Sequence, residues 1–244
     1  MRPSILLVVT TGLIAAVGAC SPVYYVPNSH NVPILQGRGD GSIAARASTL
    51  GIEVQGAYAV NDYIGLMING AGGHQVNETQ QNLGSGDVVF LEGGVGTFKS
   101  FGRFVWENYG LLGVGHVKND LEWTVRESPG TTGKIEADFL RFAFQPSLAW
   151  RSRHFDAIAS LRLSGLKHSN VSGDLVFDHT NQVSYLDSIG NQFLLEPAIT
   201  IRAGRDPLKL AFQVGGSRNL SHTTFHQVDN VASLAVVYTK RRAR

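Results

Sequence analysis

The chain has 244 residues, of which 43% are hydrophobic and only 16% are charged, and its formal net charge is +2. Soluble domains carry roughly 25% charged residues, so this chain has too few to cover an ordinary water-facing surface. The small net charge excludes the strong basic field expected of a nucleic-acid-binding protein, and the lone cysteine excludes internal disulfides.

The chain opens with the pattern of a secretory signal. Arg2 is followed by the apolar stretch from Ile5 to Val17 and by two small residues directly before Cys20. This stretch is too short for a spanning helix. The segment resembles a bacterial lipoprotein signal, which implies that acyl chains are attached to Cys20 and that residues 1–19 are removed. The alternative is a buried thiol in an ordinary N-terminal helix.

Residues 20–37 are polar, contain three prolines and show no sustained period. They predict an extended, lipid-anchored tether. The remaining residues, 38–244, form one domain whose main signal is alternation of apolar and polar residues, the period of a strand with two different faces. In 138–150, for example, Leu140, Phe142 and Phe144 alternate with Arg141, Ala143 and Gln145.

The pattern predicts about ten strands, near 38–47, 50–60, 63–74, 87–99, 103–117, 135–150, 155–167, 190–203, 208–217 and 230–240. Most have the 9–11 or so residues that an oblique strand needs to cross a bilayer. Short connections, such as Asn61-Asp62, alternate with long polar ones at 75–86, 118–134, 168–189 and 218–229. We therefore expect an all-β fold, an antiparallel up-and-down transmembrane β-barrel with its short turns at one end.

Alternation alone does not say which face points inward, and a soluble lipocalin-like barrel for ligand binding is the alternative. The polar face consists mainly of small residues and glutamine rather than lysine and glutamate, as a crowded lumen requires, and this favours lipid outside. Charged residues on the inward face would need partners. They predict a lumen charge network that plugs the barrel, made of Glu53, Glu92, Glu196, Arg141, Arg162 and Arg202.

One stretch near the start of the chain suggests a family. The runs Asn31-Val32-Pro33-Ile34-Leu35 and Gln55-Gly56-Ala57-Tyr58-Ala59-Val60, with Gly51, Glu53, Gly65 and Asn69-Gly70, resemble the opening of lipobox-bearing outer-membrane β-barrel proteins of Gram-negative bacteria. The resemblance covers about the first quarter of the chain. It implies a fold and a location in the outer membrane, with membrane lipid as partner, and no activity.

No catalytic residues, metal site or cofactor are predicted. His222 and His226 have a spacing that would bind a metal only on a helix, and they fall in an expected loop. His168 beside Ser169 forms no argued nucleophile and base pair. The sequence thus predicts a structural or surface-interaction protein that is not an enzyme. The alternatives are a narrow channel for small solutes and a lipid-modifying barrel enzyme.

Overall fold

The computed structural model describes residues 21–79, 82–123 and 131–241. The signal peptide and Cys20 lie outside the described residues. Ten long strands dominate the fold, and they are β1 (Gly41–Ser48), β2 (Ile52–Ala59), β3 (Ile64–Thr79), β4 (Asn82–Phe101), β5 (Phe104–Trp123), β6 (Thr132–Arg151), β7 (Phe155–Gly173), β10 (Gln192–Arg205), β11 (Leu208–Gly216) and β13 (Asn230–Lys240).

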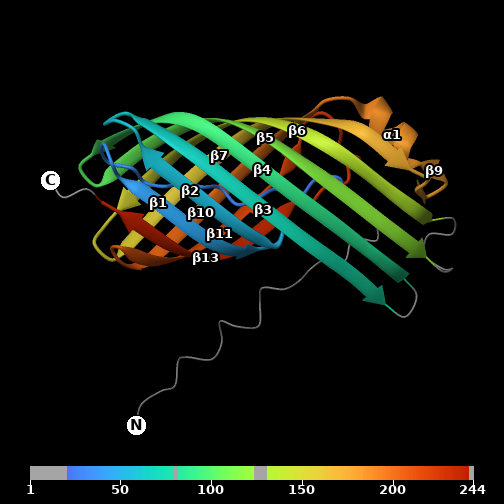
Figure 1. The fold of residues 1–244 in the computed structure, drawn as a ribbon, viewed down its shortest axis with the longest axis horizontal. Coiled ribbons are helices and arrows are strands. Elements are labelled where there is room, and N and C mark those ends of the chain that lie inside the picture. The colour runs from blue at the N-terminus through green and yellow to red at the C-terminus, as the bar shows by residue number, and fades with distance from the viewer. Residues whose placement is uncertain (1–20, 80–81, 124–130, 242–244) are drawn as a thin grey trace, which may run out of the picture.

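These strands form a closed antiparallel barrel in which each long strand pairs with the next one along the chain (Figure 1). The wall closes where β13 pairs with β1, from Gly41 opposite Lys240 to Ser48 opposite Ser233. The predicted fold, an antiparallel up-and-down barrel of about ten strands, is confirmed.

The faces of the wall are arranged with apolar side chains outside. Phe142, Ile199 and Leu210 are 58%, 53% and 58% exposed, whereas Arg141 and Glu92, which face the lumen, are each 1% exposed. An apolar exterior around a polar interior is the reverse of a lipocalin-like barrel and matches a wall solvated by hydrocarbon.

The two ends of the barrel differ. At the short-turn end, tight turns join β2 to β3, β4 to β5, β6 to β7 and β10 to β11. At the opposite end, which we call the long-loop end, β3 to β7 extend well beyond the shorter strands β1, β2, β11 and β13 (Figure 1). One helix, α1 (Gln182–Ile189), and the short strands β8 (Val176–Phe177), β9 (Thr180–Asn181) and β12 (Arg218–Asn219) also lie there.

Two of the predicted long loops are mostly strand. The regions 75–86 and 118–134 contribute to β3, β4, β5 and β6, and α1 forms within the predicted loop 168–189. The prediction failed because strand ends that project beyond a membrane have water on their outer face. Polar residues such as His74 and Asp87 therefore occupy that face, and the alternation disappears. No helix in the described ranges is long and apolar enough to cross a membrane.

The segment predicted as a tether lies inside the barrel. Residues 21–40, which we call the plug segment, run through the lumen (Figure 1). Their side chains from Tyr24 to Leu35 are almost all buried. Residues 21–40 have no strand or helix period because the surrounding wall holds this segment, which has no regular hydrogen-bond pattern of its own.

The plug segment crosses the barrel from the long-loop end to the short-turn end. Near its start, the Tyr24 N–H donates to the carbonyl of His226 (2.9 Å) and the Tyr25 carbonyl accepts from the N–H of Val228 (3.0 Å), in the loop before β13 at the long-loop end. Near its end, the Gly39 N–H donates to Ala59 O (2.9 Å) at the short-turn end. The described chain therefore begins at the long-loop end and crosses the barrel before β1 starts.

Candidate functional site: the filled lumen

The centre of the lumen holds two buried ion pairs. Arg141 Nη2 on β6 lies 2.6 Å from Glu92 Oε2 on β4, and Arg162 Nε on β7 lies 2.7 Å from Glu196 Oε2 on β10. All four side chains are 1% exposed or less. Buried charges are stable only when they are paired and further hydrogen-bonded.

The plug segment supplies those further hydrogen bonds. Asn28 Oδ1 accepts from Arg141 Nη2 (2.8 Å) and from Arg162 Nη1 (3.0 Å), so one side chain joins the two ion pairs. The hydroxyl of Tyr25 accepts from Arg141 Nη1 (2.6 Å) and donates to Glu196 Oε1 (2.9 Å). The guanidinium of Arg141 also lies over the ring of Phe90, 4.3 Å from its centroid.

The six predicted network residues are thus all buried in the lumen, but they do not form one network. Glu53 accepts from the N–H (3.1 Å) and hydroxyl (3.0 Å) of Ser29, and Arg202 donates to the carbonyl of Val32. In the described part of the chain, neither forms an ion pair with another member of the set. We call the six residues the lumen belt. The plug segment takes the place of charged partners for Glu53 and Arg202, and the sequence did not indicate that it would be there.

Three glutamines from three separate strands hold consecutive residues of the plug segment. Gln55 Nε2 donates to Ser29 O (2.9 Å) and Gln145 Nε2 to Asn31 O (2.8 Å). Gln213 both accepts from the His30 N–H (2.7 Å) and donates to His30 O (3.1 Å). Because buried backbone groups must be hydrogen-bonded, these side chains allow an irregular segment to be buried.

Sequence reasoning missed several charged residues of the lumen. Glu107 accepts from the backbone N–H groups of Ile34 (3.2 Å) and Leu35 (2.8 Å), and Lys209 lies 2.9 Å from both carboxylate oxygens of Asp156. Glu107 has the same parity as Val105 and Tyr109, and all three are buried. Because alternate residues of a strand share a face, this shared parity could have indicated that Glu107 lies on the inward face of β5.

Apolar clusters close the lumen on both sides of the lumen belt. Towards the short-turn end, Val32 and Ile34 of the plug segment pack with Val105, Ala149 and Ile158 of the wall. Towards the long-loop end, a larger cluster contains Tyr24, Phe139, Leu186 and Phe225. Beside the plug segment, a cavity lined by Asn28 and His30 has a volume of only about 10 Å³, which is about the space for one water molecule.

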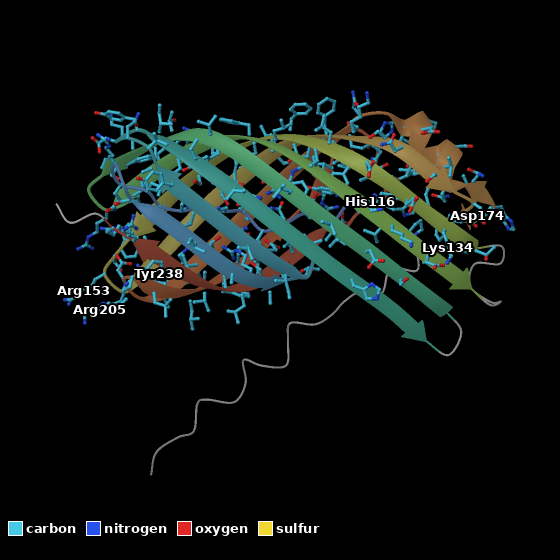
Figure 2. The ribbon with its side chains drawn as sticks, in the orientation of Figure 1. His116, Lys134, Arg153, Asp174, Arg205 and Tyr238 are labelled. Carbon is cyan, nitrogen blue, oxygen red and sulfur yellow. The ribbon has the colours of Figure 1, made fainter. Side chains whose placement is uncertain are left out.

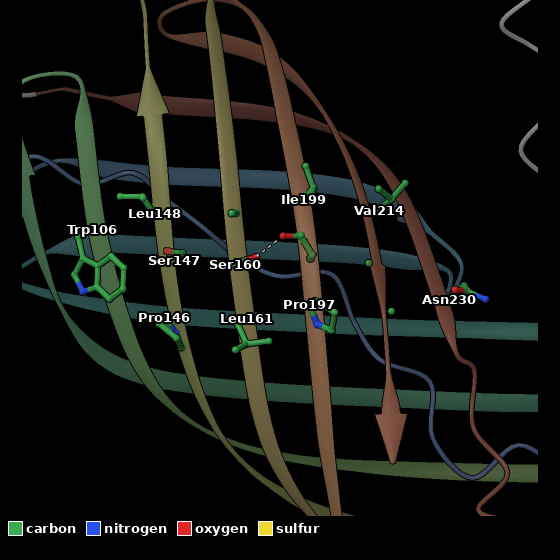
Figure 3. Close-up of a pocket in the computed structure, with 14 residues that line it drawn as sticks. Trp106, Pro146, Ser147, Leu148, Ser160, Leu161, Pro197, Ile199, Val214 and Asn230 are labelled. Atoms are coloured by element: carbon green, nitrogen blue, oxygen red, sulfur yellow. Dashed lines mark hydrogen bonds between the residues drawn. The ribbon is translucent and has the colours of Figure 1, made fainter. Parts of the chain in front are cut away.

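A larger groove, of about 740 Å³, lies on the outside of the wall (Figure 3). Trp106, Pro146, Leu161 and Ile199 contribute to its lining, and small residues such as Ala159 and Gly215 make room for it. Its apolar side chains share the exterior face with the rest of the lipid-facing wall. It does not belong to the polar lumen.

The structure separates the side chains of His168 and Ser169. His168 turns inward and its Nε2 lies 3.1 Å from the carbonyl of Tyr24, whereas its neighbour Ser169 is exposed, because successive residues of a strand face opposite ways. Among the described residues there is no group of three or more histidine, cysteine, aspartate or glutamate side chains that could hold a metal ion.

Comparison with known proteins identifies similar barrels. No family model and no curated protein matches the sequence. Among solved structures, the chain is similar to CarO2 of Acinetobacter baumannii (TM-score 0.39, 10% identity, covering 84% of this chain and 100% of that chain). It is also similar to LpxR from Salmonella typhimurium (TM-score 0.36, 7% identity, covering 82% and 99%) and to the COG4313 outer membrane channel from Pseudomonas putida F1 (TM-score 0.36, 10% identity, covering 84% and 96%). The likeness is one of fold and extends to no activity.

Proposed function

We propose that this protein is a sealed outer-membrane β-barrel lipoprotein with a structural or surface-interaction role. The observation that carries the proposal is the plug segment, which fills the lumen with its own side chains and leaves a cavity of only about 10 Å³ beside Asn28 and His30. A narrow channel needs a continuous water-filled path through the barrel. Here two apolar clusters and the lumen belt block the lumen. We propose no enzymatic role and no cofactor.

The apolar exterior supports a membrane location. Only helices and closed barrels satisfy their backbone hydrogen bonds within a bilayer, and a barrel with an apolar outer band is the form found in outer membranes. Exposed aromatic side chains surround the short-turn end, where an interfacial girdle is expected, and they include Tyr58, Tyr63, Phe101, Phe104 and Tyr238.

Conductance in planar bilayers tests the sealed lumen. We expect the full-length protein to give no stable current steps. A variant lacking residues 24–33 should give them if it folds, and retained barrel migration on an unheated gel would show that it does. As a second variant, Val32→Asp places a charge in the apolar cluster that contains Val105 and Ile158 and should produce intermittent current. Reproducible steps from the unaltered protein would contradict the proposal.

The lipid anchor is part of the same proposal. Cys20 precedes Ser21, and the hydrogen bonds of the plug segment at Tyr24 and Tyr25 lie at the long-loop end. We infer that the acyl chains are carried on the same side of the membrane as the long loops, because the plug segment crosses the barrel between them and β1. Mass spectrometry of the N-terminal peptide should find Cys20 acylated, and a Cys20→Ser variant should lack the modification.

Epitope tags on intact cells test the side. A tag inserted between Ser21 and Pro22 should bind antibody on intact cells, because outer-membrane barrels place their long loops outside. A matched tag inserted between Arg153 and His154, at the short-turn end, should bind only after permeabilisation. The reverse pattern would show that the barrel is inserted the other way, and two hidden tags would refute the proposed exit of the plug segment.

A further inference from the structure

Arginines gather at the short-turn end. Arg103, Arg151, Arg153 and Arg205 come from three different turns and line a cavity of about 430 Å³ together with Ser152 and Asp206, a set that we call the rim pocket. Figure 2 shows Arg153 and Arg205 at this end of the barrel, close to Tyr238 and far from Lys134 and Asp174. The pocket lies outside the lumen belt and has no part in the sealing described above.

The three turns that carry these arginines are tied to each other. The Arg151 N–H donates to Arg103 O (2.8 Å), and the Gly204 N–H donates to His154 O (2.9 Å). Within its own turn, the Ser152 hydroxyl donates to Phe155 O (2.7 Å). The backbone beneath the pocket is therefore held by hydrogen bonds, and the four arginines line one common cavity.

Within the described residues, the positive charge of the rim pocket is only partly balanced: Asp206 lines the pocket, and Asp156 and Asp40 lie close enough to act on the charge of Arg151. These carboxylates already have other partners: Lys209 Nζ lies 2.9 Å from both oxygens of Asp156 and 3.7 Å from Asp206 Oδ1, and Arg241 Nη1 lies 3.1 Å from Asp40 Oδ2. Within the described ranges, none of the four guanidinium groups forms an ion pair with a carboxylate. Arginines in the lumen donate to carboxylate, carbonyl or hydroxyl oxygens, whereas the described residues place no carboxylate within ion-pair distance of these four guanidinium groups.

The neighbours of these arginines indicate what the partner is. In the sequence, Arg103 lies between Phe101 and Phe104, and the rings of these two phenylalanines are stacked with their centroids 6.0 Å apart. Arg151 follows Trp150, and the ring of Trp150 lies 6.3 Å from that of Phe155. Aromatic side chains in this position mark the boundary between hydrocarbon and headgroups, so the arginines lie at the depth of lipid phosphates. Guanidinium groups bind phosphate through paired, charge-assisted hydrogen bonds.

We propose that the rim pocket binds the phosphate group of an anionic glycerophospholipid in the membrane leaflet at the short-turn end. The acyl chains of that lipid would lie along the apolar outer wall below the aromatic side chains. This proposal rests on the proposed membrane location, but it requires neither a sealed lumen nor a lipid on Cys20.

Native mass spectrometry of the full-length protein in detergent tests the site. The probes are phosphatidylglycerol and a diacylglycerol with the same acyl chains but no phosphate. We expect selective retention of phosphatidylglycerol, and about tenfold weaker retention by the double variant Arg153→Gln with Arg205→Gln, because two charge-assisted contacts are lost. The matched control, Lys167→Gln with Arg218→Gln, removes two positive charges from the opposite half of the barrel and should bind as the unaltered protein does.

Further measurements distinguish a lipid phosphate from a soluble phosphate and distinguish loss of the site from loss of the fold. Equal weakening by the control variant, or equal retention of diacylglycerol, would overturn the site. Complete displacement by an equal concentration of inorganic phosphate would assign the pocket to a soluble anion and overturn the lipid. Unchanged barrel migration on an unheated gel shows that each variant is folded. Since binding is measured in detergent, failure here is distinct from the appearance of current steps in a bilayer.

Discussion

The lumen belt and the rim pocket are both rich in arginine, and they differ in what surrounds the charge. Arg141 and Arg162 are fully buried, and each has a carboxylate partner within 2.7 Å. Arg153 and Arg205 are exposed and have none among the described residues. Charge inside the barrel therefore holds the plug segment in place, whereas charge on the rim is available to something outside the protein. The predictions below test that division.

Breaking a buried ion pair should have the largest effect. Arg141→Met leaves Glu92 buried without its partner, which should lower the free energy of unfolding by about 3–5 kcal/mol. Urea unfolding in lipid vesicles, followed by tryptophan fluorescence, measures it. The double variant Arg141→Met with Glu92→Gln removes the stranded charge and should recover part of the loss. A double variant as unstable as the single one would show that the pairing is not what matters.

Removing the link between the two ion pairs should cost somewhat less. Asn28→Ala takes away the oxygen that accepts from both Arg141 and Arg162, leaving two buried charged N–H groups without that acceptor. We expect a loss of about 2–3 kcal/mol in the same unfolding measurement. Asn28→Asp keeps the acceptor and should remain close to the unaltered protein. If Asn28→Ala is neutral, the plug segment does not stabilise the lumen belt.

The fit of the plug segment against the wall gives a third test. A Cβ atom added at Gly65 would lie 2.5 Å from Tyr109 Oη and 2.8 Å from Leu35 Cδ1. Gly65→Ala should therefore destabilise the protein by about 1–3 kcal/mol through overpacking. Gly70→Ala is the matched control on the same strand, because nothing lies within 4 Å of its added Cβ, and its effect should stay within about 0.5 kcal/mol.

Acidification should loosen the start of the plug segment. Burial lowers the pKa of His226 below its ordinary 6.5, and its ring lies 6.2 Å from those of Tyr24 and Tyr185. The unfolded loop thus holds the proton more tightly than the folded loop. The stabilisation is complete above about pH 6.5 and declines as the pH falls below it.

Amide hydrogen exchange at Val228 measures this loosening, because that N–H donates to Tyr25 O. Protection should fall between about pH 6.5 and pH 5 in the unaltered protein. His226→Gln should reduce the pH dependence. The control is His222→Gln, which replaces a half-buried histidine in the same loop and should leave the pH dependence unchanged. Equal behaviour of the two variants would assign the effect to another group.

The rim should give the smallest effect on stability. Arg153→Gln with Arg205→Gln removes no buried contact, so the free energy of unfolding in detergent should change by less than about 0.5 kcal/mol. A larger loss would mean that these arginines have a structural role like those of the lumen belt, and the contrast between the two regions would fail.

Alternation predicted the wall of the barrel well, because the lipid-facing and lumen-facing sides of each strand require opposite residues, as Phe142 and Arg141 show. It failed where that requirement ends. Beyond the membrane both faces of β3 and β4 tolerate polar residues, and the strands there were predicted as loops. The position of the plug segment could not be predicted from the sequence for a different reason. Its position depends on Gln55, Gln145 and Gln213, which come from strands far apart in the sequence, and no local pattern in residues 21–40 records those contacts.

The seam between β1 and β13 bears on how such a molecule can be assembled. The segment that occupies the centre is the first part of the described chain, and the strand that completes the circle is the last. An open, curved sheet could wrap around residues 21–40 and shut behind them. The acyl chains proposed at Cys20 would then never have to pass through a closed barrel, and a delay in joining these two strands would leave the interior accessible from the side.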